Sequence, residues 1–92
     1  MGRPKKVVLR EADFATPAEA HEFLAERLDF PDYYGMNLDA LADCLSEVGE
    51  PTRIVVRRSA SAPKPWFEGF ERVVRDVAEQ SCYVGCTVRH DE

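Results

Sequence analysis

The chain shows two kinds of apolar pattern. Short aliphatic runs at residues 7–9 and 54–56, and the alternating segment 82–88, are typical of strands. Three longer stretches carry apolar residues three or four positions apart, which is the spacing of one buried helix face. Their apolar positions are Ala20, Phe23, Leu24 and Leu28 in the first stretch, Leu38, Leu41, Leu45 and Val48 in the second, and Phe67, Phe70, Val74, Val77 and Ala78 in the third. The pattern predicts three strands and three helices.

Polar residues predict where these helices begin and end. Thr16 is followed by a proline and then by Glu19, which together are typical of a helix N-terminus. Asn37 is a good cap for the second helix, and we expect Gly49 to end that helix. The third helix is expected to begin near Trp66.

The order of these elements, β-α-α-β-α-β, predicts a small α/β fold. A three-stranded parallel sheet would be covered by three to four helices. Because residues 54–56 form an unbroken β-branched run, we expect this strand to be covered on both faces. A Ser-, Ala- and Pro-rich stretch at 59–65 is the one loop-like segment. Residues 1–92 are therefore expected to form a single domain.

The composition narrows the class of protein. The chain has 92 residues, a formal net charge of −5 and 45% hydrophobic residues, which is typical of a globular domain. No apolar run approaches the ~20 residues of a membrane span. The apolar run after the basic start is also far shorter than the ~7–15 residues of a secretory signal. We therefore expect a cytoplasmic protein that does not bind membranes.

The cysteines suggest buried thiols more than a metal site. Cys44, Cys82 and Cys86 are an odd number, so a disulfide framework is not expected. Cys82, Cys86 and His90 are four residues apart, which leaves a metal site as the alternative. In a strand, however, the last two cysteines would share one face with two valines, as small core residues do. No cofactor or metal is expected.

Charge is distributed unevenly along the chain. Residues 1–10 hold four cations and no acid, at Arg3, Lys5, Lys6 and Arg10. Residues 29–50 hold six acids and no Lys or Arg, at Asp29, Asp32, Asp39, Asp43, Glu47 and Glu50. The acidic segment would repel phosphate and attract a basic protein, so nucleic acid is not expected as a partner. The basic start is interpreted as a solvated terminus or strand edge, with a nucleic-acid arm as the alternative.

The second helix has an acidic face opposite its leucines. The expected members of this face are Asp39, Asp43, Ser46, Glu47 and Glu50. The like charges of Asp39 and Asp43, at i and i+4, would destabilise an isolated helix by roughly 0.2–0.5 kcal/mol. Tyr33 and Tyr34 precede the helix, and aromatic residues beside unpaired carboxylates are typical of an interface for a cationic partner. An ordinary solvated face is the alternative. We expect Tyr34 in the core and Tyr33 at the surface.

The segment 31–45 carries most of these features. It contains Pro-acid-Tyr-Tyr-Gly at 31–35, Asn-Leu-Asp-Ala-Leu at 37–41 and Asp-Cys-Leu at 43–45. In these motifs it resembles the barstar family, the intracellular protein inhibitors of small secreted microbial ribonucleases. Chain length, element order and Cys82 extend the resemblance more weakly over nearly the whole chain. The resemblance implies an inhibitor, not an enzyme, that is monomeric when free and forms a 1:1 complex with a guanyl-specific ribonuclease.

The resemblance also implies roles for individual residues. In this family the loop and second helix plug the ribonuclease active site. Asp43 would enter the pocket for the substrate phosphate, and Asp39 would bind at the edge of the site. Tyr33 would pack against the region of the enzyme's catalytic histidine, and Ser46 stands where a hydroxyl residue contacts the enzyme. Asp76 matches a family acid that makes a further contact from the last helix.

The sequence departs from the family pattern in three places. Asp76 is shorter than the Glu that it would replace. Ala42 stands where the best-known member has a large aromatic residue, so contact area is lost or made elsewhere. The connection at 59–65 is shorter, so the family's short third helix is expected to be shrunken or absent.

Two other classes of function fit the residues less well. An enzyme would need a nucleophile beside a base, but neither His21 nor His90 lies near Cys44 or a nucleophilic serine in sequence. The other alternative is an acidic module that binds a different basic partner protein. Such a partner should depend about equally on Asp39, Asp43 and Glu47, whereas a phosphate mimic should depend most on Asp43.

Overall fold

The computed structural model describes residues 5–91 and confirms the predicted α/β fold. In chain order its elements are β1 (Lys5–Arg10), the 3₁₀ helix η1 (Glu11–Asp13), α1 (Pro17–Leu28), α2 (Leu38–Ser46), β2 (Thr52–Ser59), α3 (Phe67–Gln80) and β3 (Val84–Asp91). Residues 60–66 connect β2 to α3 without a helix, as expected. Arg3, one cation of the basic start, lies outside the described residues. Within the described part of the chain, no helix has the length and apolar character needed to cross a membrane.

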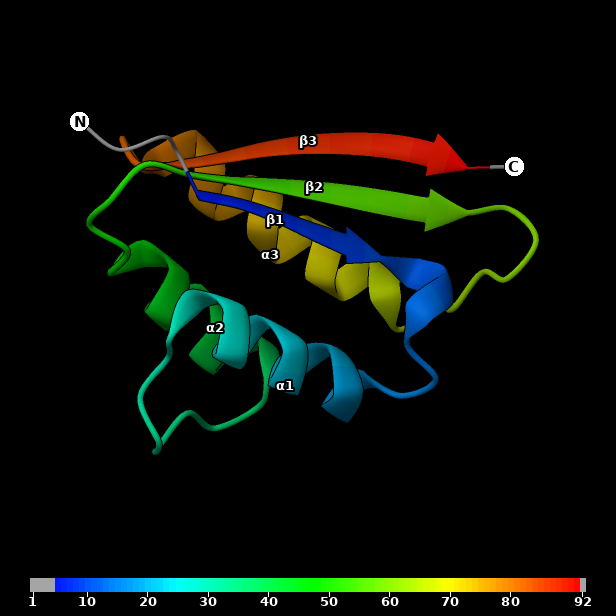
Figure 1. Ribbon diagram of the computed structural model, residues 1–92, viewed down its shortest axis with the longest axis horizontal. Coiled ribbons are helices and arrows are strands. Elements are labelled where there is room, and N and C mark those ends of the chain that lie inside the picture. Colours follow the sequence, from blue (N-terminus) through cyan, green and yellow to red (C-terminus); the bar gives the residue numbers. More distant parts are fainter. Residues whose placement is uncertain (1–4, 92) are drawn as a thin grey trace.

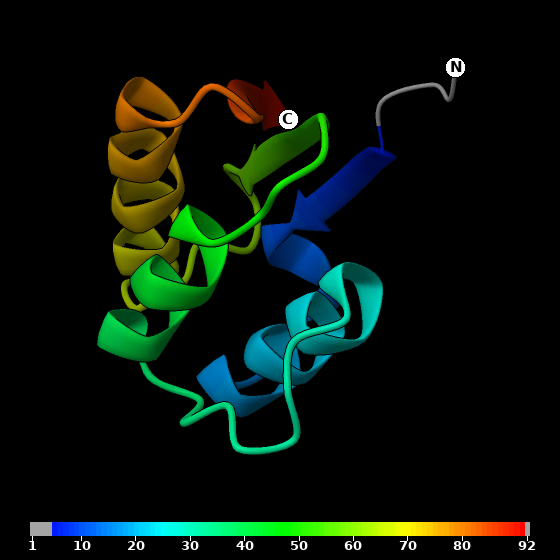
Figure 2. The same cartoon turned by 90° about the vertical axis from the view of Figure 1, so that its left-hand side faces the viewer.

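The three strands form one parallel sheet with β2 in the centre (Figure 1). Figures 1 and 2 together show α1, α2 and α3 on the same side of this sheet. The expectation that the central strand is covered on both faces is therefore wrong. Ile54 and Val56 face the helices and are fully buried, whereas Val55 points to the other face. Val55 is nevertheless only 7% exposed, because long cationic side chains on that face, including those of Arg53 and Arg57, surround it.

Side-chain caps begin the first two helices where the sequence predicted. The hydroxyl of Thr16 accepts a hydrogen bond from the backbone N–H of Glu19 at 3.3 Å, and the Glu19 carboxylate accepts one from the N–H of Ala15 at 2.8 Å. At the second helix, the side-chain oxygen of Asn37 accepts from the N–H of Ala40 at 2.8 Å. Each cap satisfies N–H groups that have no partner within the helix.

The end of α2 lies earlier than predicted. The helix ends at Ser46, before Gly49, because the N–H groups of Glu47 and Val48 bond to carbonyls three residues back and tighten the last turn. Glu47 and Glu50 therefore lie beyond the helix and are not members of its acidic face. Glu50 instead lies 3.5 Å from the ammonium group of Lys5.

β3 also begins later than predicted. The Ser81 hydroxyl accepts hydrogen bonds from the N–H groups of Tyr83 and Val84, at 3.0 and 3.2 Å, and so forms a turn ahead of the strand. Cys82 lies in this turn and is exposed, so it is not the core residue that was expected. Cys86 lies within β3 and packs against the core.

One acidic side chain is buried where β1 and β2 end. Glu11 is 1% exposed, and its carboxylate accepts hydrogen bonds from the N–H groups of Ser59 and Lys64, at 2.8 and 2.5 Å, and from Nε of Arg58 at 3.2 Å. Arg58 also pairs with Glu71 of α3. Burial alone raises the pKa of Glu11, but these donors outweigh burial and hold the pKa below its ordinary value. Glu11, Arg58 and Glu71 are called the buried ionic cluster below.

Candidate functional site

The loop between α1 and α2 holds one tyrosine inside and presents the other to solvent. The Tyr34 hydroxyl lies 2.6 Å from Nδ1 of His21, and the Tyr34 ring packs on Phe30 with 4.9 Å between ring centroids. Burial raises the pKa of Tyr34 and lowers the pKa of His21, so the hydrogen bond joins two neutral groups at pH 7. Tyr33 is 87% exposed. The prediction for the two tyrosines is confirmed.

The backbone conformation fixes the entrance to α2. Met36 adopts a left-handed conformation with φ of 54°, and Asn37 then returns to extended backbone and caps the helix. The Asn37 amide also donates a hydrogen bond to the carbonyl of Gly35 at 3.3 Å. Asp39 therefore lies in the first helical turn, where the positive end of the helix dipole favours a carboxylate.

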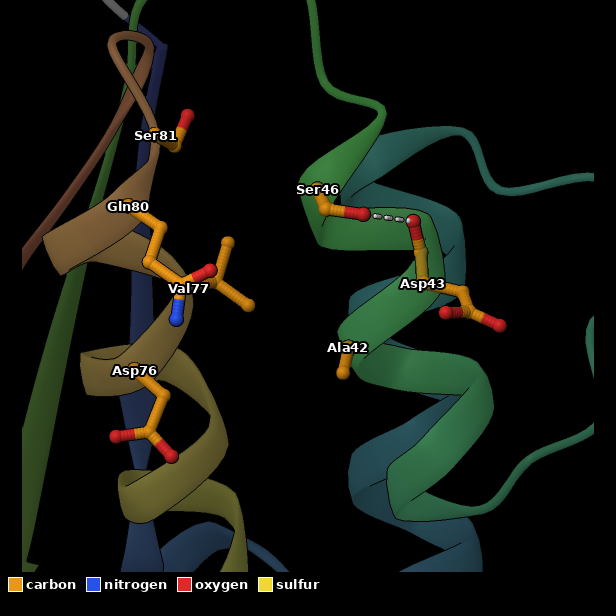
Figure 3. Close-up of a pocket in the computed structure, with 7 residues that line it drawn as sticks. All are labelled: Ala42, Asp43, Ser46, Asp76, Val77, Gln80 and Ser81. Atoms are coloured by element: carbon orange, nitrogen blue, oxygen red, sulfur yellow. Dashed lines mark hydrogen bonds between the residues drawn. The ribbon is translucent and has the colours of Figure 1, made fainter.

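The two aspartates of α2 are exposed and have no cationic partner. Neither Asp39 nor Asp43 forms an ion pair with any residue that the structure describes. The Ser46 hydroxyl donates to the main-chain carbonyl of Asp43 at 2.8 Å, not to its carboxylate. In Figure 3 the Asp43 carboxylate points away from α3, and Asp43 is exposed. Its charge is available to another molecule.

A hollow of about 370 Å³ separates part of α2 from α3 (Figure 3). The helices approach closely at Gly69, where an added Cβ would lie 2.6 Å from the Leu38 side chain. Near Ala42 the side chains are too small to fill the space between them. The hollow is lined by Ala42, Asp43, Ser46, Asp76, Val77, Gln80 and Ser81. Four predicted site residues from two helices thus meet at one hollow.

A second hollow, of about 250 Å³, lies between α2 and the preceding loop. It is lined by Pro31, Tyr33, Tyr34, Gly35, Ala40, Asp43, Cys44 and Glu47. Asp43 lines both hollows and therefore lies between them, whereas Asp39 lines neither. The six predicted residues are called the acidic surface below: Tyr33, Asp39, Ala42, Asp43, Ser46 and Asp76.

Sequence reasoning missed three residues that line the first hollow. Val77 was placed only in the buried stripe of its helix, while Gln80 and Ser81 were not assigned. Gln80 follows Asp76 by four residues, so helical spacing alone places the two on one face. Ser81 follows the helix, and only the packing of α3 against α2 brings it to the hollow.

Cys44, the cysteine of α2, is not an activated nucleophile. Burial raises the pKa of the Cys44 thiol, and the nearby charges of Glu47 and Asp43 raise it further. The thiol is therefore protonated at pH 7 and a poor nucleophile. Among residues 5–91, no three potential metal-ligating side chains are arranged to hold a metal ion.

Comparison with known proteins identifies the family of this chain. The family described as Barstar (barnase inhibitor) matches residues 5–89. The chain belongs to the barstar family. A Bacillus subtilis (strain 168) protein with the name "Putative ribonuclease inhibitor YrdF" is 50% identical to this chain over 42 residues. That match covers 46% of this chain and 46% of the relative, which is less than half of the relative's length. Barstar family membership confirms the resemblance drawn from residues 31–45.

Proposed function

We propose that this barstar family member inhibits a small secreted ribonuclease of the guanyl-specific type by closing the enzyme's active site with the acidic surface. The observation that carries the proposal is Asp43, an exposed carboxylate between two hollows with no ion pair among the described residues. A ribonuclease binds phosphate through cationic side chains and other hydrogen-bond donors. A carboxylate held at the phosphate position would imitate the substrate's charge.

The fold holds Asp43 in a defined position. α2 packs on the core through Leu41 and Leu45, which are fully buried, and Asn37 caps its N-terminus. A carboxylate on such a helix loses little conformational entropy on binding, so more of the interaction energy contributes to affinity. The absence of Lys and Arg from residues 29–50 would also speed encounter with a cationic enzyme site.

The other residues of the acidic surface surround Asp43. Asp39 would meet a cation at the edge of the enzyme site, and Tyr33 would supply an aromatic anchor. Asp76 would add a carboxylate from α3, and Ser46 a hydroxyl from α2. Because Ala42 leaves the first hollow open, a side chain of the enzyme can fill this space. We propose a reversible 1:1 complex, since one active site accepts one plug.

Titration of ribonuclease activity tests the proposal. RNA cleavage by a small guanyl-specific microbial ribonuclease is measured against increasing amounts of this protein. We expect complete inhibition near one equivalent of the wild-type chain. For Asp43→Ala we expect affinity weaker by roughly 2–5 kcal/mol, or about 30-fold to several-thousand-fold.

The matched control is Glu22→Ala, which removes an exposed carboxylate from α1 that lines neither hollow. Its affinity should equal that of the wild type. Equal losses for Asp39→Ala, Asp43→Ala and Glu47→Ala would favour a general acidic binding module instead. Absence of inhibition by the folded wild-type chain would contradict inhibition of that class of ribonuclease.

A further inference from the structure

The face of the sheet opposite the helices is rich in cations. Side chains alternate across a strand, so every second residue of β1, β2 and β3 points away from the helices. The open sheet face consists of Lys6, Val8, Arg10, Arg53, Val55, Arg57, Gly85, Thr87 and Arg89. Five of these nine residues are cationic and none of the nine is acidic. The same alternation along β3 also includes Asp91, one acidic residue at the end of the strand. Figures 1 and 2 show that no helix covers this face.

The parallel register arranges these cations in two rows. Arg10, Arg57 and Arg89 are neighbours across all three strands, and Lys6 and Arg53 are neighbours across two. Adjacent strands lie ~4.8 Å apart, and four residues along a strand span ~13 Å. The two rows are therefore ~13 Å apart.

The strip between the rows is small and only weakly apolar. It holds Val8, Val55 and Thr87, and it forms the floor of a hollow of about 330 Å³ whose walls include Arg53 and Arg89. Protein interfaces usually bury a substantial apolar centre. This face offers little apolar area to a partner, because Val55 is only 7% exposed and has little surface left to bury.

Four of the cations are not used inside the fold. Lys6, Arg10, Arg53 and Arg89 make no ion pair with any described residue. Arg58, on the helix side of β2, is by contrast held in the buried ionic cluster. Lys6 and Arg53 are like charges on neighbouring strands, and such a pair destabilises a sheet, so fold stability does not account for these two cations.

We propose that the open sheet face binds RNA through its phosphodiester backbone. Arg and Lys bind phosphate without needing an apolar centre, which matches the composition of this face. None of the described side chains on the face is aromatic, so bases have no stacking platform and no sequence preference is expected. The choice of RNA rests on the proposed function, since RNA is the substrate of the proposed partner enzyme.

The acidic surface does not oppose binding at this face. The acidic residues of α2 lie in the helix layer, on the other side of the sheet. The molecule measures 38 × 27 × 20 Å, so even its shortest dimension is about twice the ~10 Å Debye length at 0.1 M salt. The sequence-based expectation that nucleic acid is not a partner was argued from the acidic residues 29–50 and applied to the whole protein. The RNA proposal departs from that expectation at the open sheet face.

Fluorescence anisotropy tests the proposal without any ribonuclease present. A fluorescein-labelled single-stranded RNA of mixed sequence is titrated with the full chain at several salt concentrations. We expect weak binding in the ~10⁻⁴–10⁻⁶ M range of non-specific contacts. The logarithm of the association constant should fall with the logarithm of salt concentration by about 0.7 for each phosphate contacted, or about 3 for four contacts. DNA of the same sequence should bind similarly, because the backbone is recognised.

Charge-removing variants locate the binding face. Arg53→Gln/Arg89→Gln should weaken RNA binding roughly tenfold and halve the salt slope. The control Arg27→Gln/Arg72→Gln removes the same charge from α1 and α3 and should bind RNA as the wild type does. Circular dichroism verifies folding, and Lys6→Gln serves as an additional variant if the double variant unfolds.

Three outcomes would overturn the RNA proposal. The first is that the folded wild type shows no salt-dependent binding of RNA. The second is that the control variant loses as much binding as Arg53→Gln/Arg89→Gln does. The third is that a polyglutamate peptide binds more tightly than RNA of equal charge. The last outcome would identify an acidic protein as the occupant. Ribonuclease inhibition by Arg53→Gln/Arg89→Gln should be unchanged, so failure of RNA binding is distinguishable from failure of the inhibitor proposal.

Discussion

The buried ionic cluster and the acidic surface hold carboxylates in opposite settings. Glu11 is 1% exposed, and its carboxylate accepts hydrogen bonds from two backbone N–H groups and from Arg58. Asp43 is exposed, and no described cation pairs with it. The first carboxylate is satisfied within the fold, while the second has charge to offer to another molecule.

The difference teaches how to assign acidic residues in a small domain. An acid whose donors all come from its own chain contributes to stability, and its removal leaves those donors unpaired. An acid on a rigid helix without a partner adds no ion pair to the stability of the fold and is available for binding. If this distinction holds, substitutions in the buried ionic cluster should lower the free energy of unfolding. Substitutions in the acidic surface should instead lower the affinity for the ribonuclease.

The largest expected effect on stability is that of Glu11→Ala. Removal of this carboxylate leaves Arg58 and two backbone N–H groups without their buried acceptor. We expect the free energy of unfolding to decrease by about 3–5 kcal/mol. Urea denaturation measures this change, with Glu22→Ala as the control for loss of an exposed carboxylate. A decrease below about 1 kcal/mol would show that the cluster contributes little.

Substitutions of the two tyrosines in the loop before α2 should have different effects, one on ribonuclease affinity and the other on the free energy of unfolding. Tyr33→Ala removes an exposed aromatic anchor and should weaken ribonuclease inhibition by roughly 2 kcal/mol, or about 30-fold, with little change in unfolding. Tyr34→Phe removes the hydrogen bond to His21 and should cost about 1 kcal/mol of stability while affinity stays similar. Inhibition titrations and urea denaturation measure the two quantities. A loss of stability in Tyr33→Ala without a loss of affinity would reverse the assignment.

Acid should lower the free energy of unfolding in two separate pH ranges, one linked to His21 and the other to Glu11. Burial lowers the pKa of His21 below its usual 6.5, so below that pH the unfolded chain binds a proton that the folded chain does not. The stability linked to His21 is therefore complete above pH 6.5 and decreases as the pH falls below it. The pKa of Glu11 is also lowered, so its contribution is lost only as the pH falls below its usual 4.5.

Urea denaturation on either side of pH 6.5 measures the first of these windows. His21→Gln cannot titrate there and should show less dependence on pH than the wild type. His90→Gln removes an exposed histidine and serves as the control. An unchanged pH dependence in His21→Gln would assign the effect to other groups.

The smallest expected effect is the change in the free energy of unfolding that follows a substitution in the acidic surface. Asp43→Asn removes one member of a like-charge pair on α2 and should stabilise the fold by about 0.2–0.5 kcal/mol at low salt. The gain should disappear at high salt, because screening weakens the repulsion between exposed charges. Thermal unfolding at two salt concentrations measures both changes. A decrease in stability at low salt would indicate that Asp43 has a partner within its own chain.

Local patterns predicted those parts of the fold that depend on neighbouring residues. The caps at Thr16 and Asn37 were found because a cap and its helix lie within a few residues of each other. Tyr33 and Tyr34 were distinguished correctly, and barstar family membership followed from residues 31–45. The end of α2 was predicted too late because a tightened last turn at Ser46 preceded the expected stop at Gly49.

Other features depend on contacts between residues far apart in the chain. The Glu11 carboxylate accepts hydrogen bonds from the N–H groups of Ser59 and Lys64, about 50 positions away in the chain. The spacing of apolar residues along the sequence does not predict such contacts. Residues 54–56 looked suited to burial on both faces because an apolar run does not show what covers it. Cationic side chains on the same face, including those of Arg53 and Arg57 of β2 itself, surround Val55 in place of a second helix layer.

The sequence alone determined the element order, the first two helix caps and the family, because each depends on patterns of neighbouring residues. The tertiary structure decided that Asp43 and Asp76 line one hollow and that the cations of β1, β2 and β3 form one face. Both results depend on register and packing between segments. Such contacts form only when the hydrophobic core brings distant parts of the chain together.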